Sequence, residues 1–157
     1  MASTIGTISA ATPIDAHKPH CSSASLLLLC AGAVLPLANA RISLARFRTR
    51  DLAQRNQDAK GRGLPLDHSA LQDMQSAQDI AWIVPRVARR MPFRSDCLVQ
   101  AMAAQVLLLD RGIFSEIVIG VEGGPDKPFA SHAWLVCADL VVVGGDIAQF
   151  NPILGDT

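Results

Sequence analysis

The spacing of hydrophobic residues changes once along this chain, from a helical period to a strand-like one. Four aliphatic residues recur at i, i+3, i+4 and i+7: Ile80, Ile83, Val84 and Val87. We expect this helix to end at Met91-Pro92, because a proline disfavours the helical conformation in the residue before it. A second helix is predicted over residues 96–110, with Ser95 as its N-cap and Gly112 as the left-handed residue that closes it.

After Gly112 the chain is rich in β-branched residues and predicts strands. Residues 113–121 (IFSEIVIGV) and 130–137 (ASHAWLVC) have the length and composition of strands, and residues 140–143 predict a third. Ala138-Asp139 is expected to form the tight turn between the last two. Helices followed by hairpin-connected strands predict an α+β fold with an antiparallel sheet.

The amino-terminal part of the chain allows three interpretations. Residues 21–40 carry no charge, and four arginines follow them: Arg41, Arg46, Arg48 and Arg50. They predict a buried helix that breaks near Pro36 and continues as an arginine-bearing amphipathic helix, a secretory signal ending in Ala38-Asn39-Ala40, or a membrane span. We favour the buried helix, because the basic residues follow the apolar run, whereas a secretory signal has them in front.

These patterns divide the chain into three predicted segments. Residues 1–20 are small and polar and predict a poorly ordered tail. Residues 21–67 form a helical apolar and basic segment that ends in a linker over residues 51–67, where Gly61, Gly63 and Pro65 interrupt a polar stretch. Residues 68–157 are the predicted core domain.

Composition fits one folded domain that does not bind nucleic acid. Of 157 residues, 50% are hydrophobic and 18% are charged, which excludes a disordered chain. The 14 basic residues balance 14 acidic ones, so the overall charge gives no reason to expect a nucleic-acid partner. Residues 1–50 nevertheless carry five basic residues and one acidic residue, so an anionic partner is expected to meet the first half of the chain.

The cysteines indicate a thiol site, with neither a metal centre nor a bound cofactor. Cys21, Cys30, Cys97 and Cys137 have no metal-ligand spacing, and we expect a reducing, cytoplasmic environment. Cys97 lies in the first turn of the predicted second helix, where free amide hydrogens and the helix dipole stabilise a thiolate, and Arg94 adds positive charge. A plain core cysteine remains the alternative.

His132 and Asp146 are the candidates for the other members of a catalytic triad. His132 lies on a strand of apolar and small residues, and a turn centred on Asp139 places Asp146 opposite it on the next strand. Residues opposed in this way have Cβ atoms about 4.5–5.5 Å apart, so Asp146 is expected to bind one imidazole nitrogen. The alternatives are a structural histidine and a solvated loop acid. The chain order Cys, His, Asp is that of papain-like and transglutaminase-like thiol enzymes.

Four motifs in residues 90–152 resemble one family within those enzymes. They are a Pro-x-Arg-Ser-x-Cys-Leu run, a helix that ends in Arg-Gly-Ile, a Gly-Val strand end, and a His-Ala-Trp triplet. In this order and spacing they resemble the leader peptidases of lasso-peptide biosynthesis, the microcin-processing B proteins, which belong to the transglutaminase-like superfamily. The resemblance implies that the family's catalytic residues fall on Cys97, His132 and Asp146.

The resemblance also implies a reaction and its partners. Such enzymes remove the leader from a ribosomally made precursor peptide and free the amine that a separate ATP-dependent cyclase uses. Residues 1–89 lack the alternating strand pattern of the family's small leader-recognition domain, so the chain resembles the stand-alone peptidase, which implies a separate recognition protein as partner. The cellular place expected is the cytoplasm, with contact to the inner membrane face through residues 21–50.

Two other functions remain open from the sequence. The same thioester chemistry serves acyl or amide transfer, so the chain is alternatively a transferase of this superfamily. A non-catalytic, membrane-associated scaffold built on residues 21–50 is the third hypothesis.

Overall fold

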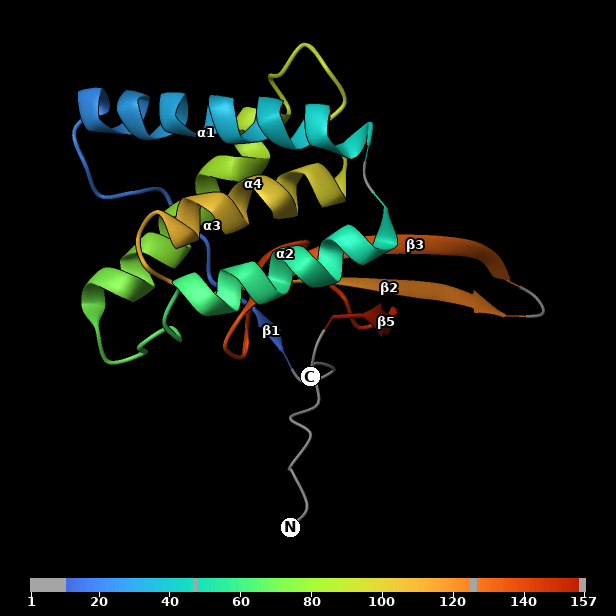
Figure 1. The fold of residues 1–157 in the computed structure, drawn as a ribbon. Coiled ribbons are helices and arrows are strands. Elements are labelled where there is room, and N and C mark those ends of the chain that lie inside the picture. The colour runs from blue at the N-terminus through green and yellow to red at the C-terminus, as the bar shows by residue number, and fades with distance from the viewer. Residues whose placement is uncertain (1–10, 47, 125–126, 156–157) are drawn as a thin grey trace.

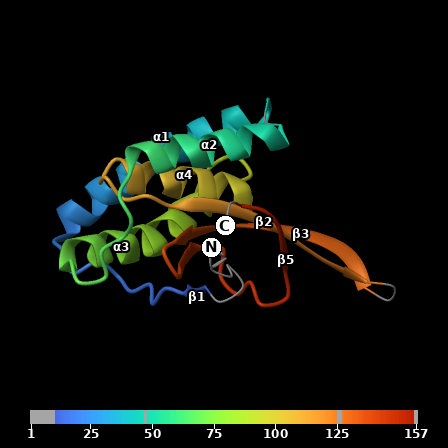
Figure 2. The same cartoon turned by 60° about the horizontal axis from the view of Figure 1, so that its bottom comes forward.

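A computed structural model describes residues 11–46, 48–124 and 127–155 as helices packed on one face of a mixed sheet (Figures 1 and 2). The described helices are α1 (Ser23–Leu44), α2 (Thr49–Arg62), α3 (Leu71–Ala88) and α4 (Cys97–Leu109). The described strands are β1 (Thr12–Pro13), β2 (Glu116–Gly124), β3 (Lys127–Cys137), β4 (Leu140–Val143) and β5 (Asn151–Leu154). Their order across the sheet is β1-β4-β3-β2-β5. Helix α1 is the outermost layer, and α4 lies between it and the sheet (Figure 1).

Side chains that alternate along β3 enter two different hydrophobic clusters. Leu135 and Cys137 join the large cluster between the sheet and the helices. Trp134 and Val136 join a smaller cluster on the opposite face, which contains no helical residue. Successive side chains of a strand point to opposite faces, so His132 shares the face of Trp134. The sheet therefore has a helical face and a Trp134 face.

The two predicted helices of the core are confirmed. Helix α3 buries Ile80, Ile83, Val84 and Val87 as the spacing predicts. Helix α4 starts at Cys97 with Asp96 as its N-cap, so the expected N-cap, Ser95, was placed one residue too early. Gly112 has a φ of 77°, as predicted for the residue that closes the helix.

Helix α1 differs from the prediction because packing outweighs the local effect of proline. The chain stays helical through Pro36, although an interior proline costs about 3 kcal/mol. Ala33, Leu37 and Ala40 are buried on both sides of the proline, in the same cluster as α3 and α4. The helix ends at Leu44, and a second helix begins at Thr49, so no single helix runs to Arg50.

The predicted linker over residues 51–67 is wrong for most of its length. Residues 49–62 form α2, and Gly63 and Pro65 lie beyond its end. Leu52, Asn56 and Ala59 are buried at i, i+4 and i+7. The buried face of α2 contains one large apolar residue, Leu52, and one amide, Asn56. Its hydrophobic periodicity is therefore too weak to be recognised in a polar sequence.

The sheet is mixed because the chain before α1 joins it. Residues 1–10 of the predicted tail lie outside the described residues, but Thr12 and Pro13 pair in parallel with β4. The Thr12 amide donates to the Asp139 carbonyl at 2.9 Å, and the Ile14 amide to the Val141 carbonyl at 3.0 Å. The other pairings between the labelled strands, including the unpredicted β5 on β2, are antiparallel. The α+β fold is confirmed, and the purely antiparallel sheet is corrected.

Candidate active site

Cys97 is the first residue of α4, and its surroundings leave the helix terminus as the main positive influence. The N-cap residue Asp96 makes no side-chain hydrogen bond to the helix, and Cys97 itself is half-buried. Arg94, which the sequence offered as a nearby cation, instead pairs with Asp96 at 3.2 Å. That pair is locally neutral, so Arg94 adds no net positive charge beside the start of α4.

His132 hydrogen-bonds a backbone carbonyl, and this acceptor defines its tautomer. Its Nε2 lies 2.7 Å from the carbonyl oxygen of Gly144. A carbonyl only accepts, so Nε2 carries the proton and the neutral ring keeps a lone pair on Nδ1. The ring also packs against Trp134 and Phe150, with centroid distances of 6.2 and 5.1 Å. This arrangement holds an imidazole whose second nitrogen is suited to act as a base.

The Gly144 carbonyl reaches His132 because the chain turns after β4. Strand β4 pairs with β3 as far as Leu135 and Val143, with a register shift between Leu135 and Val136. Gly144 and Gly145 then adopt positive φ values of 128° and 69°. A Cβ on Gly144 would lie 2.3 Å from the Cβ of Trp134. Only glycine combines this backbone conformation with so close an approach.

Asp146 does not take the place that the sequence predicted for it. It is exposed, and its Oδ1 accepts a hydrogen bond from the Ala148 amide at 3.0 Å. The nitrogen of His132 expected to meet this carboxylate is bound to the Gly144 carbonyl instead. The tight turn at Ala138-Asp139 is confirmed, but the chain leaves the ladder after Val143, before it reaches Asp146.

The structure does not join Cys97 to His132. Within residues 11–46, 48–124 and 127–155, no hydrogen bond links the two side chains. Helix α4 packs on the helical face of the sheet, whereas His132 packs with Trp134 on the other face. At His132, however, β3 no longer has β4 beside it, because β4 ends at Val143. The imidazole therefore lies beside the end of the β4 ladder, where it meets the Gly144 carbonyl in place of a paired strand.

Sequence reasoning missed the packing of two aromatic side chains against His132. Phe150 contacts the His132 ring from the turn before β5, and Trp134 fills the space beside Gly120, where a Cβ would lie 2.5 Å from its ring. The indole nitrogen of Trp134 and the hydroxyl of Ser95 are buried and find no hydrogen-bond partner among the described residues. The His-Ala-Trp triplet was the available signal for Trp134, since residues i and i+2 of a strand share a face.

Of the other cysteines, Cys30 is half-buried like Cys97, whereas Cys137 and Cys21 differ from it in exposure. Cys137 is buried, and its thiol donates to the Phe114 carbonyl at 3.1 Å. Burial, with a smaller contribution from Asp73, raises the pKa of Cys137 to about 12, so this thiol is inert at neutral pH. Cys21 is exposed, so Cys97 is not the one accessible cysteine that the sequence suggested. The described residues contain no cluster of His, Cys, Asp and Glu that fits a metal ion.

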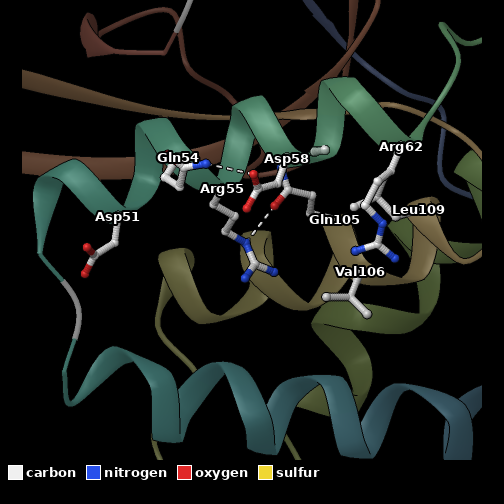
Figure 3. A pocket seen from close by; sticks show the side chains of 9 residues that line it. Asp51, Gln54, Arg55, Asp58, Arg62, Gln105, Val106 and Leu109 are labelled. Atoms are coloured by element: carbon white, nitrogen blue, oxygen red, sulfur yellow. Dashed lines mark hydrogen bonds between the residues drawn. The ribbon is translucent and has the colours of Figure 1, made fainter.

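A polar cluster between α2 and α4, separate from the candidate active site, makes contacts that hold the fold together (Figure 3). The Arg55 guanidinium donates to Gln105 Oε1 at 2.7 Å and to the Met102 carbonyl at 2.9 Å. Asn56 donates to the Ile117 carbonyl at 2.9 Å and accepts from the Ile117 amide at 3.1 Å. Burial lowers the pKa of Arg55, which carries no carboxylate partner here. This network ties α2 to the edge of β2.

Comparison with known proteins places the chain in a family. Residues 33–155 match the family model described as the Transglutaminase-like superfamily. The chain belongs to this superfamily. The match includes α2 and most of α1 as well as the segment from α3 to β5. Searches of curated proteins and of solved structures gave no match.

Membership of the transglutaminase-like superfamily limits the reactions to be expected of this protein. The superfamily typically comprises cysteine-dependent enzymes, and it includes both cysteine proteases and acyl transferases. Both reactions proceed through a thioester on a cysteine that a histidine assists. Cys97 on α4 and His132 on β3 are the residues that the sequence predicts for those roles.

Proposed function

We propose that this protein is a cysteine peptidase that removes the leader from a ribosomally synthesised lasso-peptide precursor. The observation that carries the proposal is the pair of candidate groups: a cysteine at the first position of α4 and a histidine whose tautomer leaves Nδ1 free. The motif order around them, from the Pro-x-Arg-Ser-x-Cys-Leu run to the His-Ala-Trp triplet, supports the lasso-peptide family within the superfamily.

The proposed reaction uses the thiol as nucleophile and the imidazole as a proton carrier. His132 Nδ1 takes the proton of Cys97, and the sulfur attacks the carbonyl carbon that joins the leader to the remainder of the precursor. The carbon–nitrogen bond breaks as His132 returns the proton to the leaving amine. Water, deprotonated by His132, then hydrolyses the thioester and releases the leader as a carboxylic acid.

The proposal requires the two side chains to approach each other when a peptide binds. Hydrogen bonds between catalytic groups are often long in a free enzyme and tighten in the substrate complex. Because α4 packs on the helical face of the sheet and His132 on the Trp134 face, this approach requires the chain around the end of β4 to rearrange. In the free protein the Gly144 carbonyl orients the ring, and Asp146 is the alternative acceptor to be tested.

Partners and location follow from the same proposal. The leader is held by a separate recognition protein, and the freed amine passes to an ATP-dependent cyclase, all in the cytoplasm.

The three functions left open by the sequence differ in what they make from a precursor. Peptidase activity gives a leader with a free carboxylate, and transfer gives a leader joined to an added amine. A scaffold leaves the precursor intact.

The test is mass spectrometry of the precursor after incubation with the full chain, with and without the recognition protein. We expect cleavage at one bond, faster when the recognition protein is present. Cys97→Ala is expected to abolish cleavage while far-ultraviolet circular dichroism stays unchanged, and Cys21→Ser, which changes an exposed thiol, is the matched control. Cleavage by Cys97→Ala at the normal rate would remove this cysteine from the reaction.

A further inference from the structure

Helix α1 exposes a stripe of large aliphatic side chains on the outside of the molecule. Leu27, Leu28, Leu35 and Ile42 are 70%, 74%, 71% and 66% exposed. Leu35 follows the adjacent pair Leu27 and Leu28 by eight and seven residues, and Ile42 follows Leu35 by seven, so all four lie on one face of the helix. We call these four residues the α1 stripe. Helix α1 is the outermost layer in Figure 1, and the described residues leave the α1 stripe exposed.

An apolar groove lies beside the α1 stripe. It has a volume of about 630 Å³ and opens between α1 and the end of α3. Its walls include these apolar and basic residues: Leu27, Val34, Trp82, Met91, Arg86 and Arg90. The stripe and the groove together form one apolar surface that is continuous through Leu27.

Positive charge without carboxylate partners surrounds this surface. The Arg86 guanidinium lies 4.1 Å above the Trp82 ring and donates to the Trp82 carbonyl, and Arg90 donates to the Arg86 carbonyl. In the part of the chain that the structure describes, the arginine–carboxylate pairs involve Arg50 and Arg94, which are not among these. Further arginines at the end of α1 and α3 also have no ion pair among the described residues: Arg41, Arg46 and Arg89.

We propose that the α1 stripe and the groove bind the surface of an anionic phospholipid bilayer, with α1 lying in the plane of the interface. Apolar side chains flanked by arginines suit a membrane surface, because the former enter the acyl boundary and the latter meet phosphate groups. Trp82 beneath Arg86 adds an amphipathic ring of the kind found at this level of a bilayer. The surface is apolar at its centre and basic around it, so an anionic membrane surface is the partner that complements it.

The same helix does not suit a membrane crossing. Of the described helices, α1 is the one long and apolar enough to span a bilayer, with a mean hydropathy of 1.7. Its inner face, however, buries Ala33, Leu37 and Ala40 in the core shared with α3 and α4. Extracting α1 from that core would expose the apolar faces of both neighbours. Surface attachment keeps the core closed and uses only the outer face.

The test is sedimentation of the full chain with vesicles. We expect it to bind phosphatidylcholine vesicles that contain about 25% phosphatidylglycerol, to bind pure phosphatidylcholine weakly, and to dissociate at about 0.5 M salt. Leu28→Glu with Leu35→Glu should lower the partition coefficient at least about tenfold. Leu71→Glu is the matched control, because Leu71 is 88% exposed at the far end of α3 from Arg86.

A second variant separates the role of charge from that of apolar contact. Changing Arg41, Arg46 and Arg89 to glutamine should weaken binding to the anionic vesicles and leave the thermal unfolding midpoint within error, since all three side chains are exposed. No binding to either vesicle overturns the proposal, as does binding that the double glutamate variant retains. Loss of self-association, or of recognition-protein binding, in that variant without any vesicle binding assigns the surface to a protein and also overturns it.

Discussion

Replacing Gly144 with alanine should destabilise the fold more than the same change at Gly145. The φ of Gly144 is 128°, which costs a non-glycine residue about 1–3 kcal/mol. The new Cβ would also lie 2.3 Å from Trp134 Cβ, and relieving such a contact in a packed core costs about 1–3 kcal/mol more. We therefore expect Gly144→Ala to lower the free energy of unfolding by about 2–6 kcal/mol.

Gly145 provides the matched control because it shares the backbone strain without the close contact. Its φ is 69°, and a Cβ there meets nothing within 4 Å. Alanine in the left-handed region costs about 1–2 kcal/mol. The difference between the two variants therefore measures how tightly the chain after β4 is held against Trp134.

The same pair of variants tests how His132 is oriented. The backbone shift that relieves the contact with Trp134 displaces the Gly144 carbonyl, so the 2.7 Å hydrogen bond to Nε2 should lengthen. Nitrogen NMR of the imidazole should show the proton on Nε2 in the natural protein and in Gly145→Ala, and a mixture of tautomers in Gly144→Ala.

The assays are urea unfolding followed by circular dichroism and the imidazole spectra recorded at about pH 8.5, where free histidine is neutral. Equal losses of stability in Gly144→Ala and Gly145→Ala, with equal imidazole spectra, would refute the reasoning. A change of tautomer in Asp146→Asn, with none in Gly144→Ala, would transfer the orienting role to the carboxylate.

Three further predictions test other parts of the structure. Asp146→Asn should keep the rate of leader cleavage within about threefold, because Asp146 does not contact His132; a loss of about 10–10³-fold would make it the third catalytic group. Asn56→Ala leaves the buried Ile117 amide and carbonyl without partners and should cost about 2–5 kcal/mol in urea unfolding, whereas Lys60→Ala on the exposed side of α2 should change stability by less than about 0.5 kcal/mol. Burial raises the pKa of Cys137 to about 12, above its ordinary value. The contribution of the neutral thiol to stability is therefore complete below about pH 9 and is lost as the pH rises toward 12. The urea midpoint should fall between pH 8 and about pH 10.5, and the fall should be smaller in Cys137→Ala.

The sequence by itself determined those elements whose signals are local. The aliphatic spacing of α3, the glycine after α4 and the turn at Ala138-Asp139 each depend on neighbours within a few residues, and all three are present. The superfamily was also readable from the sequence. The assignment of Cys97 and His132 as nucleophile and base stays a prediction, which rests on residue type and on position within α4 and β3. Local periodicity and side-chain chemistry carry this information without a three-dimensional context.

Tertiary structure decided everything that depends on distant partners. Helix α2 exists because Leu52 and Asn56 are buried against elements far along the chain, and β1 because Thr12 pairs with β4. The acceptor of the His132 hydrogen bond was not predictable for the same reason. It is a backbone carbonyl, which every residue carries, and the register shift in β4 and the turn at Gly144 bring it to the ring. A sequence distinguishes side chains, whereas the position of a main-chain oxygen is fixed only when the fold is complete.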